Sequence, residues 1–215
     1  KNFMGTSAIV GNNIPLGVGL GLSLKNNKNN KNISIVFLGD GATEEGVFYE
    51  SLNFASLHKI PVLFICENNF YSVYSSLRVR RPKKFKITQI PKSFGIDSIC
   101  VKDNNLKSYY LAMKKAFNFC RRGKGPFFLE YYTYRWLEHC GPNFDNNIGY
   151  RSNNEYIKWK KNDPYLKLEK FFLKQNKEKI FDMKKSINKE IDLAFKFAVK
   201  SKYPNKKFAL SDNYK

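Results

Sequence analysis

The stretch that most constrains this chain runs from Ile33 to Tyr71, where two apolar runs flank a segment with helical spacing. The sequence predicts a strand over 33–38, a helix over about 45–59 and a second strand over 62–66. Apolar runs without alternation are typical of strands buried on both faces of a parallel sheet. A crossover helix of this length joins parallel neighbours, almost always with a right-handed connection. We therefore expect the residues that follow each strand to emerge at the same edge of the sheet.

The residues that follow the two strands are polar. The first strand ends at Gly39-Asp40-Gly41, and the second ends at Glu67-Asn68-Asn69. Unpaired N–H groups and the dipole at a helix start attract phosphate, and a carboxylate there holds a divalent cation that bridges to a diphosphate. Asp-Gly is also a common turn, and Asn-Asn recurs in this chain, so only their shared position carries the signal. The pattern favours a magnesium and nucleotide or diphosphate site at the strand ends.

Length and charge bound the alternatives. With 215 residues, the chain is long enough for one well-packed α/β domain with a small appendage. The net charge of +20 raises the alternative of a basic nucleic-acid-binding α/β protein. Lysine is scattered along the whole chain, however, and this disfavours nucleic acid as a partner. The densest basic run, Arg78–Lys86, is interpreted as a solvated loop, with docking of an acidic partner as the alternative.

The cysteines, the apolar runs and the first residues indicate the cellular compartment of the protein and what precedes this chain. The four cysteines are far apart and include no C-x-x-C pair, which favours a reducing compartment over a zinc site or a disulfide framework. No apolar run is long enough to cross a bilayer, so no membrane partner is expected. The chain begins at Lys1 in what resembles the middle of a domain, and we expect that an N-terminal portion is missing.

The remaining sequence predicts further elements around this βαβ unit. The segment from Tyr71 to Phe94 is expected to begin as a loop, and Asn105 lies in a capping signal. Further helices are predicted over 15–25, 106–122, 154–161, 164–175 and 181–201, and further strands over 98–102 and 126–135. We expect a core domain over 1–150 and a helical extension over 151–215 that packs on it through an apolar stripe of the last helix.

Three passages of sequence together resemble a known family. They read GDGATEEGVFYESLNFAS, FICENNFYSVYS and YRWLEHCGP. They are similar to the α subunit of the decarboxylating component of the thiamine-diphosphate-dependent 2-oxoacid dehydrogenases, of the pyruvate, acetoin or branched-chain type. The resemblance implies the thiamine-diphosphate-binding fold, an α/β fold whose mostly parallel sheet is flanked by helices, here followed by C-terminal helices.

The resemblance also implies roles for individual residues. A first set would bind magnesium: Asp40, Asn69 and the carbonyl of Tyr71. A second set would bind thiamine diphosphate: Gly41 and Ala42 at the diphosphate, Ala8 and Val10 at the aminopyrimidine ring, and Asn69, Arg135 and His139. His139 would also be catalytic, through hydrogen bonding or proton transfer during acyl transfer. Leu137 and Glu138 depart from the family's usual histidine and glycine, and alanine at position 8 departs from its commoner glycine.

The implied activity is the oxidative decarboxylation of a 2-oxoacid, most simply pyruvate. The implied partners are a β subunit, in an α2β2 assembly that supplies the activating glutamate, and a lipoyl-bearing acyltransferase component that accepts the acyl group. The implied location is the cytoplasm, or an organelle matrix in a eukaryote. A transketolase-like or acetolactate-synthase-like enzyme is the alternative within thiamine-diphosphate chemistry.

Overall fold

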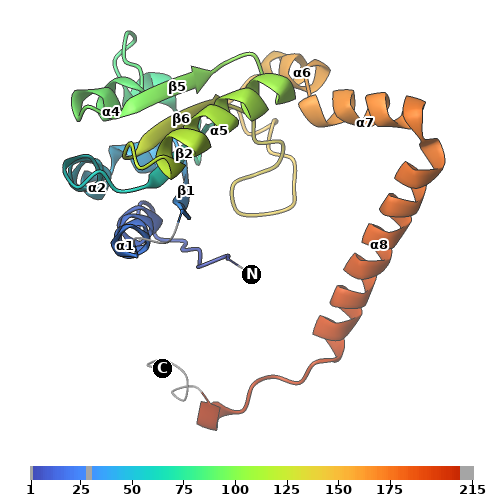
Figure 1. Cartoon of the computed structure of the whole chain (residues 1–215). Helices are drawn as coiled ribbons and strands as arrows, with labels where there is room; N and C mark the ends of the chain where they lie inside the picture. The colour runs from blue at the N-terminus through green and yellow to red at the C-terminus, as the bar shows by residue number, and fades with distance from the viewer. Residues whose placement is uncertain (1, 28–30, 209–215) are drawn as a thin grey trace. The chain divides into compact units, whose positions relative to one another are not determined.

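A four-stranded parallel sheet forms the centre of the computed structural model, which describes residues 2–27 and 31–208 (Figure 1). Its strands lie in the order β1 (Ser34–Gly39), β2 (Val62–Asn68), β6 (Phe127–Tyr132) and β5 (Asp97–Val101). All three pairings are parallel. The predicted α/β class and parallel sheet are thus confirmed, and β1 lies at one edge of the sheet in the described part of the chain.

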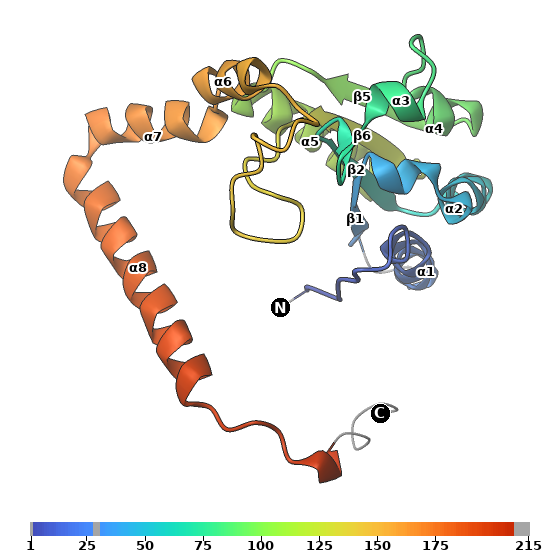
Figure 2. The same ribbon diagram turned by 180° about the vertical axis from the view of Figure 1, so that it is seen from behind.

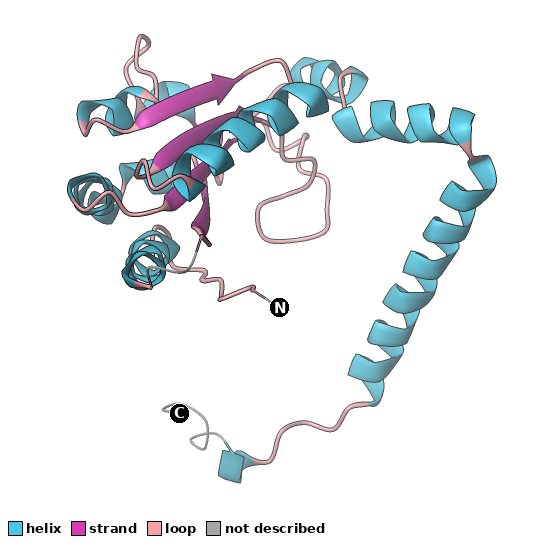
Figure 3. Ribbon diagram, in the orientation of Figure 1, coloured by secondary structure: helices cyan, strands magenta, loops and turns pink. Residues whose placement is uncertain are grey.

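Helices cover both faces of this sheet (Figure 3). On one face lie α1 (Asn13–Asn26), α2 (Gly46–Leu57) and the short α4 (Gln89–Ser93). On the other face lies α5 (Leu106–Arg121), which the side chain of Asn105 caps by accepting a hydrogen bond from the backbone of Lys107. This arrangement explains the unbroken apolar run of β2, since a strand covered on both sides has no face for polar residues. In β1 every second residue is exposed, so the expectation of burial on both faces is wrong for that strand.

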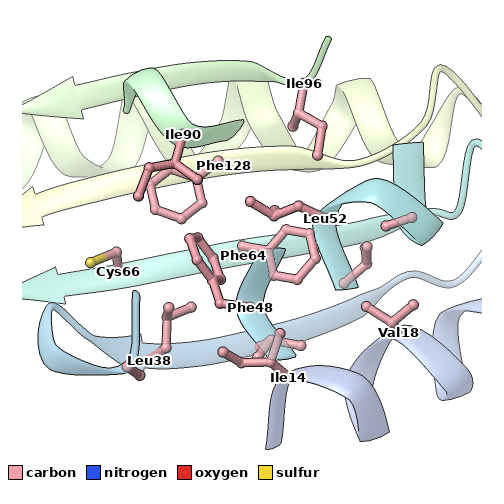
Figure 4. Close-up of a cluster of buried hydrophobic side chains, with 14 of the residues drawn as sticks. Ile14, Val18, Leu38, Phe48, Leu52, Phe64, Cys66, Ile90, Ile96 and Phe128 are labelled. Atoms are coloured by element: carbon pink, nitrogen blue, oxygen red, sulfur yellow. The ribbon is translucent and has the colours of Figure 1, made fainter. Parts of the chain in front are cut away.

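The larger core cluster lies between the sheet and α1, α2 and α4 (Figure 4). Phe48 and Leu52 of α2 pack against Phe64 of β2 and Phe128 of β6, and all four side chains are fully buried. Burial of each such side chain contributes about 1.5 to 3 kcal/mol. This packing fixes α2 on the sheet and therefore fixes the turn that joins β1 to α2.

The turn region contains short elements that the sequence did not predict. A 3-10 helix, η1 (Gly41–Glu44), precedes α2. The expected loop after β2 instead holds a hairpin of β3 (Tyr71–Ser72) and β4 (Ser75–Ser76), followed by α3 (Leu77–Arg80) (Figure 2). The hairpin has no glycine and turns through positive φ at Val73, so the usual sequence signal for a turn is absent.

The C-terminal part is helical, as predicted. It contains α6 (Asn153–Lys161), α7 (Pro164–Gln175), α8 (Lys177–Lys200) and the short η2 (Lys206–Phe208). The chain forms two compact units that divide between Pro164 and Tyr165, so α6 belongs to the first unit. The apolar side chains of α8 are exposed, and their packing on the core domain stays a prediction. Among the described residues, no helix is long and apolar enough to cross a membrane.

Candidate functional site

The ends of β1 and β2 lie side by side. The register places Gly39 opposite Glu67, so Asp40 and Asn68 leave the sheet at the same edge. This confirms the juxtaposition of the two polar clusters that the βαβ pattern predicted. In a parallel sheet of this kind, the carboxyl ends of the strands are the usual place for a ligand.

Asp40 is a buried carboxylate at this edge, with 1 % of its surface exposed. Burial raises the pKa of Asp40, and a hydrogen bond and ion pair with Arg80 oppose that rise. Backbone hydrogen bonds from Asp40 itself and from Asn69 also lower the pKa, but the net direction is upward. Asp40 and Asn69 are therefore in direct contact, and the carboxylate is held by positive and dipolar partners.

The two asparagines after β2 play different structural parts. Asn68 is buried; its amide donates a hydrogen bond to Oε1 of Glu130 at 2.7 Å, and its Oδ1 accepts one from the backbone of Phe70. Asn69 is partly exposed, and its Oδ1 accepts a hydrogen bond from the backbone of Tyr71 at 2.9 Å. Asn68 therefore anchors the loop to the sheet, while Asn69 shapes the turn beside Asp40.

Gly41 brings the β1 edge against the following hairpin. A Cβ atom at Gly41 would lie 2.7 Å from Oγ of Ser72, closer than real side chains approach. The side chain of Tyr71 points away toward α6, where its hydroxyl donates to Glu155 at 2.7 Å. The structure thus brings Asp40 and Asn69 together, with Gly41 beside Ser72 and Tyr71 in the turn that Asn69 shapes, and their roles stay predictions.

The donor set at this edge fits a hard divalent cation. It offers one carboxylate from Asp40, which accepts a hydrogen bond from the backbone of Asn69, and the amide and carbonyl oxygens of Asn69 and Tyr71 belong to the same turn. Magnesium uses few protein ligands when phosphates and water complete its octahedron. No group of three or more His, Cys, Asp or Glu residues suited to a metal exists in the described ranges.

Two arginines that the sequence interpretation assigned to a solvated loop lie at this edge. Arg80 pairs with both Asp40 and Glu44, and Arg81 donates to the carbonyl of Thr43 at 2.9 Å. The interpretation as a fully solvated run is therefore wrong for these two residues. The acidic partners of these two arginines, Asp40 and Glu44, belong to the same chain. The only sequence signal for this pairing was that acidic residues follow one predicted strand and basic residues follow the next.

The predicted ring-binding residues lie in a turn before α1. Ala8 and Val10 are both exposed, and the turn closes where the backbone of Asn12 donates to the carbonyl of Ile9. Gly11 has a φ of +80°, and a Cβ there would lie 3.2 Å from side-chain atoms of Glu45. The turn thus adjoins the start of α2, and the roles of Ala8 and Val10 stay predictions.

Arg135 and His139 differ in how firmly the structure places them. Arg135 donates to the carbonyl of Val73 at 3.1 Å and to the hydroxyl of Tyr150 at 2.8 Å, which joins the loop after β6 to the hairpin. Burial alone would raise the pKa of Asp145, but hydrogen bonds from Tyr150 and Arg151 and the nearby arginine charges lower it below its usual value. That ionised carboxylate ties the loop together. His139 is exposed in the same loop, and its role stays a prediction.

These observations define an α/β protein in which the polar residues Asp40 and Asn69 meet at the carboxyl ends of two parallel strands. The sequence pattern of the family described as "Dehydrogenase E1 component" matches residues 1–207. The chain belongs to this family.

Curated relatives and solved structures are similar to the chain. It is 36 % identical over 214 residues to the testis-specific, mitochondrial pyruvate dehydrogenase E1 component subunit alpha of Homo sapiens, covering 95 % of this chain and 52 % of that protein. It is 33 % identical to the corresponding Rickettsia bellii subunit, covering 95 % of this chain and 62 % of that one. The chain thus spans about half to three fifths of these relatives. A Pichia stipitis transketolase matches with a TM-score of 0.47 at 22 % identity, covering 57 % of this chain and 19 % of that chain.

Proposed function

We propose that this chain is the cofactor-binding part of the α subunit of a thiamine-diphosphate-dependent 2-oxoacid dehydrogenase, with pyruvate as its substrate. The observation that carries the proposal is that Asp40 and Asn69 meet at the strand ends. Next to them is Gly41, where a side chain would clash with Ser72. The similarity to pyruvate dehydrogenase α subunits supports the choice of substrate. The implied thiamine diphosphate and Mg²⁺ fit the donor chemistry of this edge.

In this proposal, the chain's residues bind and orient the cofactor. Asp40, Asn69 and the carbonyl of Tyr71 would hold the metal, and the backbone N–H groups of Gly41 and Ala42 would donate to the diphosphate. The turn with Ala8 and Val10 holds the aminopyrimidine ring. Bound thiamine diphosphate supplies the electron sink for loss of carbon dioxide.

The loop after β6 would act on the substrate side. Arg135 closes the loop over the hairpin through its bond to Val73, and His139 donates a hydrogen bond or a proton near the diphosphate and the acyl group. Exposure of His139 suits a residue that meets a partner-borne group. We assign the acyl group's acceptor to a lipoyl domain of a second component.

Assembly and location follow from the same proposal. A β subunit completes the site in an α2β2 tetramer, so the α chain alone has no turnover. All four cysteines are free thiols, which suits a reducing compartment. The named relatives come from mitochondria and from bacteria. We accordingly place the protein in a bacterial cytoplasm or an organelle matrix.

Calorimetric titration of the full-length α subunit, assembled with its β partner, tests the proposal. Thiamine diphosphate in the presence of Mg²⁺ should bind, and Asp40→Asn should weaken that binding about a hundredfold or more, because even outer-shell changes at metal sites cost 10- to 100-fold. Asp97→Asn is the matched control, since Asp97 is an exposed carboxylate at the start of β5, the opposite end of the sheet. Absence of binding by the unaltered assembly, or equal affinities of the two variants, would refute the proposal.

A further inference from the structure

Arg80 is held at the candidate metal site by three contacts. Its Nη2 donates to Oδ2 of Asp40, its Nη1 donates to Oε1 of Glu44, and its Nε donates to the carbonyl of Ser75 at 3.1 Å. Only 11 % of its side chain is exposed. The guanidinium is therefore a placed group, fixed by the hairpin and α3, and not a mobile surface charge.

The partner that Arg80 contacts is the carboxylate that the proposed function assigns to the metal. A buried carboxylate without a cation is unfavourable, because burial removes the water that would stabilise its charge. In the protein without cofactor, Arg80 is the cation in direct contact with Asp40. A metal ion bound to the same carboxylate would bring a second positive charge close to the guanidinium, so the metal and Arg80 compete for the one negative charge of Asp40.

We propose, resting on the proposed function, that Arg80 is an internal competitor of the metal. It stabilises the cofactor-free site by pairing with Asp40, and it is released to Glu44 when Mg²⁺ binds. Magnesium affinity is lowered by the free energy of the Arg80–Asp40 pair, because that pair exists only without the metal.

Glu44 makes the release of Arg80 feasible. It already accepts a hydrogen bond from the second guanidinium nitrogen, and 30 % of its side chain is exposed, so solvent supports its charge. Arg80 therefore keeps an ionic partner after it leaves Asp40. Arg81 lies nearby, 3.6 Å from Glu44 through Nε, but its guanidinium otherwise contacts the carbonyl of Thr43 and the ring of Phe85. Arg81 thus shares the acidic neighbour of Arg80 without contacting the metal ligand.

The test titrates Mg²⁺ at saturating thiamine diphosphate into the full α and β assembly, followed by calorimetry. Arg80→Gln removes the competing charge, and we expect its dissociation constant for Mg²⁺ to fall about tenfold, the low end of what a hydrogen bond between charged groups contributes. Arg81→Gln, the matched control, should change it less than twofold. In the absence of both ligands, Arg80→Gln should also melt at a lower temperature than Arg81→Gln, because Asp40 has then lost its cation.

A second titration separates this inference from a direct role of Arg80 in phosphate binding. With Mg²⁺ saturating and thiamine diphosphate varied, Arg80→Gln should bind the cofactor within twofold of the unaltered protein. Unchanged or weaker Mg²⁺ binding by Arg80→Gln, or weaker thiamine diphosphate binding at saturating Mg²⁺, overturns the competitor role. If the unaltered assembly binds neither ligand, the proposed function fails, and the inference fails with it.

Discussion

Helix α1 approaches β1 so closely that adding a single methyl group at Gly17 should destabilise the protein. A Cβ atom at Gly17 would lie 2.1 Å from Cγ2 of Val36, which no real pair of atoms tolerates. The substitution Gly17→Ala must therefore push α1 away from the strand. The same helix offers a matched control, because a Cβ at Gly19 would have nothing within 4 Å.

Two opposing effects set the change in the free energy of unfolding that Gly17→Ala causes. Alanine in place of glycine in a helix interior stabilises it by about 1 kcal/mol. Overpacking a buried contact costs about 1 to 3 kcal/mol, and the 2.1 Å approach places Gly17 at the upper end of that range. Gly17→Ala should thus lose about 1 to 2 kcal/mol in free energy of unfolding, whereas Gly19→Ala should gain about 0.5 to 1 kcal/mol.

Urea denaturation of the assembled protein, followed by tryptophan fluorescence, compares the two variants under identical conditions. A second substitution isolates the cause: Val36→Ala removes the clashing atom, and a Cβ at Gly17 would then meet Cβ of Val36 at an ordinary 3.5 Å. Gly17→Ala should therefore cost much less in the Val36→Ala background than in the unaltered protein. If Gly17→Ala proved as stable as Gly19→Ala, the close packing of α1 on β1 would be refuted.

Two further predictions concern the site. Gly41→Ala should weaken binding of thiamine diphosphate with Mg²⁺ by driving Ser72 and the hairpin away, and adding Ser72→Gly should restore it in the same calorimetric titration, since the clash is with the Ser72 side chain. Glu130→Gln should stabilise the protein at pH 7 but not at pH 4. Burial raises the folded-state pKa of Glu130 above its usual 4.5, so the unaltered protein loses stability as the pH rises through the folded-state pKa and the buried carboxyl ionises. Glutamine stays uncharged at both pH values and still accepts the hydrogen bond from Asn68. The gain is about 1.4 kcal/mol for each tenfold change in proton affinity, and equal unfolding midpoints of the two proteins at pH 7 would count against it.

The sequence was sufficient where hydrophobic burial alone decides the structure. The strands over 33–38 and 62–66 were predicted from their apolar runs, and the structure has β1 and β2 there. Burial on both faces holds for β2 but not for β1, where every second residue is exposed. The meeting of Asp40 with the Asn68–Asn69 turn then followed from topology. Helix ends moved by a few residues where capping depends on single contacts.

The sequence was insufficient where specific polar contacts decide the structure. The turns at Phe70 and Val73 take positive φ without glycine, which these residues adopt only because neighbouring contacts require it. One such contact is the bond from the backbone of Leu77 to the carbonyl of Phe70. The placement of Arg80 depends on that hairpin, so a lysine- and arginine-rich segment gave no sign of which charge would be buried.

The position of β1 at the sheet edge also has a practical side. Ile35 and Phe37 point away from α1 and α2 and are 41 % and 56 % exposed, beside a row of backbone groups with no neighbouring strand in the described residues. Such an apolar edge templates pairing between chains, which leads to aggregation in concentrated preparations. Ile35→Lys places a charge on this strand and is therefore the substitution of choice for keeping a sample of this stretch monodisperse.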